Sequence, residues 1–147
     1  MKPILAFLKT TRPVNLLIIA VTMYAMKCCV KDPFILLALE LSSKSGGGLA
    51  ISYMSKGHFF LLTLVMVFLA ASGNIINDYF DVKVDRINKP NRITIDRGLK
   101  RRVAMAAHHT LNGIAVLIGL YLGWVEQIWF YAFTPVFIAG ALWLYSF

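Results

Sequence analysis

The residues of this chain that could do chemistry gather in one short polar stretch, which ends a long apolar segment. Residues 59–73 carry no charged side chain, and amide and carboxylate side chains follow at intervals of one to four residues. They are Asn74, Asn77, Asp78, Asp81 and Asp85. On a helix this spacing places the five side chains on one polar stripe. The stretch therefore predicts a helix end whose carboxylates share a face.

Carboxylates on such a stripe need a positive partner. They repel one another, they are costly at membrane depth, and they are disfavoured near the negative C-terminal end of a helix. A hard divalent cation is the simplest partner, since Mg²⁺ takes one or two protein carboxylates and completes its shell with water and phosphate oxygens. We therefore expect Asp78, Asp81 and Asp85 to hold Mg²⁺ against a phosphate-bearing ligand. The alternative interpretation is an acidic patch on a frayed helix end.

A basic turn follows the acidic stripe. Pro90 ends the helix and biases its neighbours toward turn geometry. Lys89 and Arg92 are then expected close to the carboxylates, where they can contact phosphate oxygens on the side away from the metal. The alternative is a solvated loop whose charges set membrane orientation. We favour that alternative for the basic residues further on, which are Arg97, Lys100, Arg101 and Arg102.

Composition indicates the elements that must position these residues. Of the 147 residues 59% are hydrophobic, and the mean hydropathy is +0.69. Apolar runs close to the roughly 20 residues that a membrane-spanning helix needs occur repeatedly. We predict an all-α membrane protein forming a single domain over residues 1–147, with four transmembrane helices. The predicted spans lie near residues 14–30, 59–80, 103–123 and 128–145.

The segment between the first two predicted spans is expected to be a partly interfacial loop over residues 31–57. Its apolar run, residues 33–41, is too short to cross a membrane. Residues 42–48 read SSKSGGG, which is typical of a flexible polar turn. The sequence therefore predicts no regular element that joins the first span to the second.

The basic residues are distributed as in a multi-pass membrane protein. Three of them precede the first span and eight lie between the second and third, whereas residues 124–127 carry Glu126 and no basic side chain. By the positive-inside rule, both termini and the Asp-rich loop face the cytoplasm. We expect a bacterial or archaeal cell membrane, with its lipids as partners. The net charge of +8 fits this orientation and an anionic ligand better than it fits nucleic acid.

Two histidines and an asparagine lie near the cytoplasmic end of the third predicted span. They are His108, His109 and Asn112. One of them could face a substrate cavity. Polar side chains that bond between packed membrane helices are the commoner explanation, and we favour it.

Residues 77–92 (NDYFDVKVDRINKPNR) resemble the first Asp-rich motif of the UbiA superfamily of intramembrane prenyltransferases, N-D-x-x-D-x-x-x-D followed by a basic K-P-x-R turn. Residues 12–15 (RPVN) are similar to the entry of the family's first helix, and the four-span layout matches the family's N-terminal half. The loop over residues 88–102 is similar to that of members that make archaeal lipids.

The resemblance implies a lipid-embedded helical enzyme that transfers a prenyl group from a prenyl diphosphate to a lipophilic acceptor. The acceptor is an aromatic ring or a glycerol-phosphate lipid. The resemblance also implies that Asp78, Asp81 and Asp85 are catalytic and bind the Mg²⁺ cofactor. The substrate-binding residues expected beside them are Asn15, Asn74, Asn77, Lys89 and Arg92.

The chain departs from the family pattern in two places. Members commonly continue the basic turn with a proline, whereas Ile93 follows Arg92 here. The family also uses a second Asp-rich motif on a later helix, and the other acidic residues of this chain are isolated. We therefore expect Mg²⁺ and diphosphate binding but no turnover by this chain alone, with a C-terminal half or a second copy completing the site. The alternative is a non-catalytic four-helix membrane binding protein or subunit that retains the site.

Overall fold

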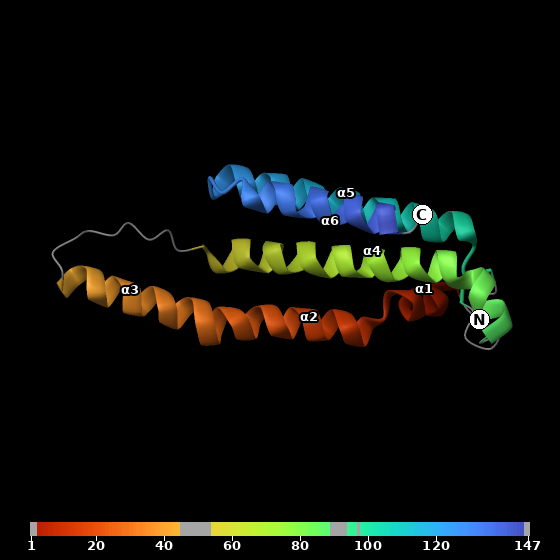
Figure 1. Ribbon diagram of the computed structural model, residues 1–147, viewed down its shortest axis with the longest axis horizontal. Helices are drawn as coiled ribbons and strands as arrows, with labels where there is room; N and C mark the ends of the chain where they lie inside the picture. The colour runs from red at the N-terminus through yellow and green to blue at the C-terminus, as the bar shows by residue number, and fades with distance from the viewer. Residues whose placement is uncertain (1–2, 45–53, 89–93, 97, 146–147) are drawn as a thin grey trace.

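The computed structural model describes residues 3–44, 54–88, 94–96 and 98–145, and every regular element among them is helical (Figure 1). The all-α prediction is therefore confirmed for these residues. The elements are α1 (Pro3–Thr11), α2 (Pro13–Met26), the π-helical turn η1 (Lys27–Lys31), α3 (Asp32–Lys44), α4 (Lys56–Asn88), α5 (Arg101–Val125) and α6 (Phe130–Tyr145).

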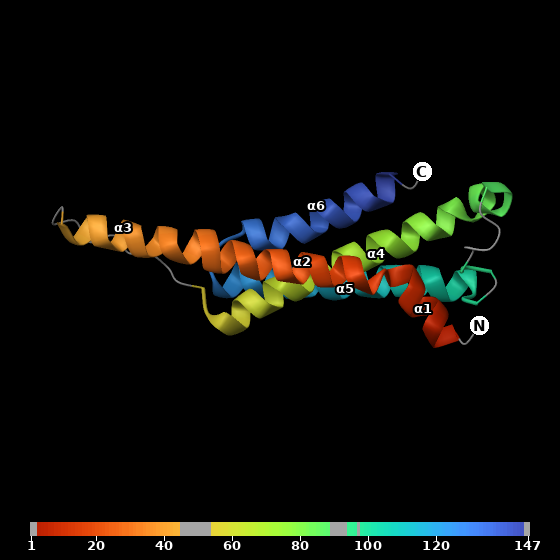
Figure 2. The ribbon, with the colours of Figure 1, turned by 90° about the horizontal axis from the view of Figure 1, so that it is seen from below.

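Helix α4 is the centre of the bundle. It packs most extensively on α5, while α1 and α2 contact it from another side and α6 reaches it from its place on α5. In Figure 1, α4 lies between the α2–α3 rod and the α5–α6 pair, and in Figure 2, seen from below, α4 runs behind the rod at an angle to it. The helix that carries the polar stripe is therefore in contact with helices on both sides.

Helices α2 and α3 form one continuous rod, joined by η1. The prediction of a loop over residues 31–57 is therefore wrong for residues 31–44, which are helical, and for residues 56–57, which begin α4. Residues 45–53 of the predicted loop lie outside the described residues. The Asp32 N–H bonds to the Lys27 carbonyl five residues back. This wider π-type register lets the helix continue past Pro33, which has no N–H of its own to contribute. The same spacing lets Lys27 Nζ pair with Asp32 Oδ2 at 2.7 Å.

Among the residues that the structure describes, three helical stretches are long and apolar enough to cross a membrane. They are Pro13–Lys44, Lys56–Val82 and Arg101–Val125. The fourth predicted span, near residues 128–145, corresponds to α6, an apolar helix of 16 residues. That is shorter than the roughly 20 residues of a typical span, so the fourth crossing stays a prediction.

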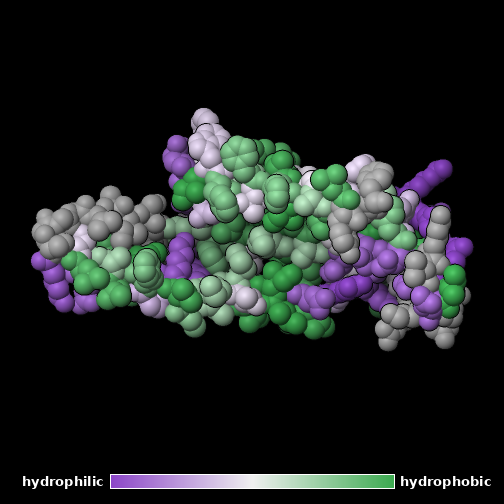
Figure 3. Space-filling view, viewed as in Figure 1, coloured by the Kyte–Doolittle hydropathy of each residue, from purple (hydrophilic) through white to green (hydrophobic). Residues whose placement is uncertain are grey.

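The surface of the molecule has the polarity of an integral membrane protein. Hydrophobic side chains cover the middle of the face in Figure 3, and hydrophilic ones gather at the end where α1 and the end of α4 lie. Large apolar side chains on α2, α3 and α6 are more than half exposed, among them Leu17, Phe34 and Phe137. Such a surface is stable against lipid rather than against water.

Glycines bring α5 and α6 into close contact. A Cβ atom at Gly119 would lie 2.4 Å from Pro135 Cγ and 2.7 Å from the Tyr131 carbonyl oxygen. One at Gly123, a turn later, would lie 3.0 Å from Ala132 Cβ. Small residues four apart let helix backbones approach each other in membranes. Gly119 therefore sets the distance between these two helices.

Replacing Gly119 with alanine is expected to destabilise the protein by about 1–3 kcal/mol, because the new methyl group overlaps Pro135 and backbone that cannot move aside easily. Thermal unfolding in detergent micelles, followed by circular dichroism, measures the effect. Gly113→Ala is the matched control on α5, since a Cβ there would have no atom within 4 Å apart from its chain neighbours and the nearby backbone of its own helix. Equal melting temperatures for the two variants would contradict the assigned close packing.

Candidate functional site

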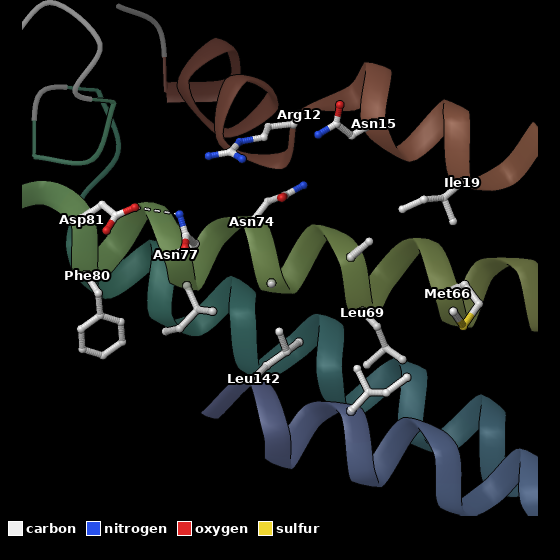
Figure 4. Close-up of a pocket in the computed structure, with 14 residues that line it drawn as sticks. Arg12, Asn15, Ile19, Met66, Leu69, Asn74, Asn77, Phe80, Asp81 and Leu142 are labelled. Atoms are coloured by element: carbon white, nitrogen blue, oxygen red, sulfur yellow. Dashed lines mark hydrogen bonds between the residues drawn. The ribbon is translucent and has the colours of Figure 1, made fainter. Parts of the chain in front are cut away.

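A cavity of about 820 Å³ lies between α2, α4 and α6 (Figure 4). Its lining is polar at one end and largely apolar over the rest of its length. The polar end is formed by Arg12, Asn15, Asn74, Asn77 and Asp81. The rest is largely apolar and includes Ile19, Met66, Leu69, Ile138 and Leu142. The arrangement suits an amphiphile with a charged head group and a hydrocarbon tail.

The break between α1 and α2 directs Arg12 at the Asp stripe. Arg12 has φ 54° and ψ 66°, in the left-handed region, and Pro13 then begins α2 at the position that proline favours. The Arg12 Nη2 donates to Asp78 Oδ1 at 2.8 Å. A left-handed residue with a side chain costs about 1–2 kcal/mol, whereas an exposed ion pair contributes about 0–1 kcal/mol. The ion pair alone therefore does not explain the conformation of Arg12.

Two amide side chains of the stripe have definite partners. Asn77 Nδ2 donates to Asp81 Oδ2 at 2.8 Å, as the dashed line in Figure 4 marks. This bond fixes the rotamer of the Asp81 carboxylate at the wall of the cavity. Asn74 Nδ2 donates to the carbonyl of Thr11, the last residue of α1, at 3.0 Å. A hydrogen bond of this kind contributes about 0.5–1.5 kcal/mol, which helps to hold the turn at Arg12.

The structure brings most of the predicted site residues to one place. Four of them line the cavity: Asn15, Asn74, Asn77 and Asp81. Asp78 joins this group through its ion pair with Arg12. Asp85 is described by the structure but does not line the cavity, because it lies one turn beyond Asp81 on α4. Lys89 and Arg92 lie outside the described residues.

Arg12 is the site residue that the sequence reasoning missed. It stands in the stretch similar to the family's helix entry, yet the motif itself gave it no contact with the carboxylates. Its position directly before Pro13 indicates the residue that precedes a helix, but not the direction of its side chain. The contact with Asp78 spans 66 positions, so no local pattern encodes it.

The carboxylates fit a hard cation by their chemistry, although they are not assembled as a closed metal centre. Within the described ranges, no group of three His, Cys, Asp or Glu side chains is placed to hold a metal together. Asp78 is directed to Arg12, and Asp81 to Asn77. Mg²⁺ often takes only one or two protein carboxylates and leaves the remaining positions to water and phosphate. The donor set therefore fits Mg²⁺ in that open manner.

The end of the basic loop is anchored to the bundle. Asp96 Oδ2 lies 3.0 Å from Arg86 Nη2 and 3.3 Å from Arg101 Nε. The Arg101 guanidinium also lies over the Tyr79 ring, 5.3 Å from its centroid. Ile95 is buried in a core cluster that α1, α4 and α5 share. Arg101 is therefore a packed residue rather than only a solvated charge, and Asp96 is paired with two arginines.

A buried polar network joins α4 to α5. Ser72 Oγ donates to Asn112 Oδ1 at 2.6 Å, and His108 Nδ1 lies 2.9 Å from Ser72 Oγ and 3.1 Å from the Ser72 carbonyl oxygen. His108 Nε2 lies 3.2 Å from Asn112 Nδ2. Bonding between packed helices is therefore confirmed for His108 and Asn112. His109 is exposed and lies beside the Trp143 ring.

Comparison with known proteins gives a family match. The family model described as the UbiA prenyltransferase family matches residues 33–147. The chain is 36% identical over 96 residues to the digeranylgeranylglyceryl phosphate synthase of Thermococcus sibiricus, covering 63% of this chain and 34% of that protein. It is 48% identical over 65 residues to the protein of the same name from Pyrococcus horikoshii, covering 44% of this chain and 23% of that protein.

A third relative of the same name, from Korarchaeum cryptofilum, is 32% identical over 88 residues, which cover 60% of this chain and 31% of that protein. The chain thus spans about a third or less of the curated relatives it matches. No solved structure matches the chain. The resemblance seen in residues 77–92 is confirmed by the family match.

Replacing His108 with leucine is expected to destabilise the protein by about 1–3 kcal/mol, because Ser72 and Asn112 lose a partner in a buried site. His109→Leu, at the exposed neighbouring position, should change stability little. Chemical unfolding in mixed micelles distinguishes the two variants. The structural role of the network would be contradicted if His108→Leu were as stable as the His109 variant.

Proposed function

This chain belongs to the UbiA prenyltransferase family, and we propose that it carries the diphosphate-binding part of a magnesium-dependent prenyltransferase. One observation supports this most directly: a cavity whose polar end holds Arg12, Asn77 and Asp81 continues between apolar helix faces. A prenyl diphosphate has the matching shape and polarity. Its charged head would lie at the end of α4, and its chain would extend along α2 and α6.

The acceptor we propose is a glycerol-phosphate lipid rather than an aromatic ring. The relatives from Thermococcus, Pyrococcus and Korarchaeum are all named digeranylgeranylglyceryl phosphate synthases. Because this chain spans only part of those proteins, we propose donor binding for the chain itself. Turnover is proposed for the longer arrangement, in which further chain or a second copy completes the metal site.

The residues at the polar end of the cavity would have different roles in binding Mg²⁺ and the diphosphate. Asp78, Asp81 and Asp85 would hold Mg²⁺, which when bound neutralises diphosphate oxygens and acts as a Lewis acid at the leaving group. Asn77 would keep Asp81 oriented, as its hydrogen bond indicates. Arg12, with a delocalised charge suited to phosphate oxygens, would contact the diphosphate from α2. Asn15, Lys89 and Arg92 are proposed as further substrate contacts.

In the proposed reaction, the bond between the first prenyl carbon and the diphosphate oxygen breaks, and diphosphate leaves with the electron pair. A hydroxyl oxygen of the acceptor bonds to that carbon and passes its proton to the departing diphosphate. Charge on the prenyl carbon is exposed to attack by water, so a dry surrounding is needed. The apolar lining formed by Ile19, Met66 and Leu69 supports that requirement.

For the membrane orientation we propose four crossings, with α6 as the fourth, and the Asp-rich end and both termini in the cytoplasm. The basic residues of the loop between α4 and α5 support this placement by the positive-inside rule. Figure 1 is consistent with it, since α1 and the last turns of α6 lie toward the same end of the bundle as the end of α4. The whole of residues 1–147 is proposed as one domain.

Replacing Asp81 with asparagine is expected to weaken Mg²⁺-dependent binding of geranylgeranyl diphosphate by roughly tenfold or more, since even outer-shell changes at metal sites cost 10–100-fold. Isothermal titration of the protein in lipid nanodiscs, with and without Mg²⁺, measures this. Glu40→Gln is the control, since Glu40 is an exposed acid on α3, at the other end of the molecule. Equal affinity of the Asp81 variant and the unaltered protein would refute the site.

A further inference from the structure

Asn74 differs from the other polar residues of the cavity lining, because its side chain is bonded to the backbone of another helix. Its Nδ2 donates to the Thr11 carbonyl at 3.0 Å, and Thr11 is the last residue of α1. The acceptor belongs to the peptide group that directly precedes Arg12. Asn74 is therefore hydrogen-bonded to the backbone at the break between α1 and α2.

The Thr11 carbonyl is one of the groups that a helix end leaves without an intrahelical partner. Earlier carbonyls in the last turns of α1 are bonded by local hydroxyls: Thr10 Oγ1 donates to the Phe7 carbonyl at 2.8 Å and Thr11 Oγ1 donates to the Leu8 carbonyl at 3.0 Å. The Thr11 carbonyl instead receives its donor from α4. This end of α1 is therefore completed by a long-range bond from the helix that carries the Asp stripe.

Asn74 and Asp78 lie four residues apart on α4, on one face, and they hold Arg12 at two points. Asn74 holds the backbone just before it, and Asp78 accepts from its guanidinium at 2.8 Å. Arg12 remains in the left-handed region between these two attachments. The arginine is thus presented to the cavity by a rigid connection between helices rather than by its ion pair alone.

We propose that Asn74 is a positioning residue for Arg12: it fixes the break between α1 and α2 so that the guanidinium faces the end of the cavity that receives the diphosphate. This inference rests on the proposed function. It replaces the expectation that Asn74 is itself a substrate ligand. The two roles differ in one measurable respect, because a positioning residue has no effect of its own once the group it positions has been removed.

A double-mutant cycle between Asn74 and Arg12 tests the proposal. Asn74→Leu keeps a similar volume without a donor, and Arg12→Gly removes the guanidinium while glycine accepts the left-handed backbone without strain. Binding of geranylgeranyl diphosphate in the presence of Mg²⁺ is measured in nanodiscs for both single variants and the double variant. We expect each single variant to bind several-fold more weakly, and the double variant to match Arg12→Gly within about twofold.

Other outcomes would overturn the proposal. If the two losses multiply in the double variant, Asn74 contacts the ligand independently of Arg12. If Asn74→Leu or Arg12→Gly binds as the unaltered protein does, the connection between them has no role in binding. If Asn74→Leu does not fold, as judged by its elution from a sizing column, Asn74→Ala takes its place in the cycle.

The conservative variant Asn74→Gln adds a second criterion. It retains an amide donor that can reach the Thr11 carbonyl after a small adjustment, so partial recovery of binding relative to Asn74→Leu is expected. No recovery at all would count against a hydrogen-bonding role. Asp81→Asn, measured in parallel, distinguishes failure of this inference from failure of the proposed function. Binding that depends on Asp81 but not on Asn74 refutes this inference alone. No binding by the unaltered protein refutes the proposed function.

Discussion

Carboxylates at the end of an apolar helix must be stabilised where the hydrocarbon of the membrane gives way to water, and the rest of the structure is arranged around that need. The stripe on α4 receives an arginine from the α1–α2 break and an amide from its own helix. These contacts reduce the repulsion between neighbouring acids without closing the site. Asp81 stays at the wall of a cavity, where an additional cation and a phosphate group can reach it.

Placing α4 at the centre of the bundle makes this arrangement possible. On one side it is fixed to α5 by the Ser72–His108–Asn112 network, which resists sliding because each member would lose a buried partner. On the other side Asn74 bonds to the end of α1. The polar stripe therefore lies between α5, to which α4 is hydrogen-bonded, and the end of α1, which is followed by Arg12. The close contact of α5 with α6 at Gly119 holds α6, which contributes Ile138 and Leu142 to the cavity lining.

The features that the sequence predicted are those that depend on local spacing and composition. The stripe and the apolar helices belong to this class. Helix α3 was missed because its apolar run, residues 33–41, is too short to cross a membrane alone and a polar stretch follows it, while a π-type turn joins this run to α2. The contacts of Arg12 and Asp96 were missed because they join segments that only the folded bundle brings together.

The rod formed by α2, η1 and α3 has a consequence for the membrane itself. It runs for 32 residues, which at 1.5 Å per residue is about 48 Å, well beyond a hydrocarbon core of about 30 Å. The rod also carries the charged residues Lys27, Lys31 and Asp32, so it fits the bilayer only if it tilts or if its α3 end extends beyond the hydrocarbon. The rod is also the element that carries Asn15 and Ile19 at the cavity wall. The tilt of the rod therefore sets the depth in the bilayer at which these two cavity residues lie.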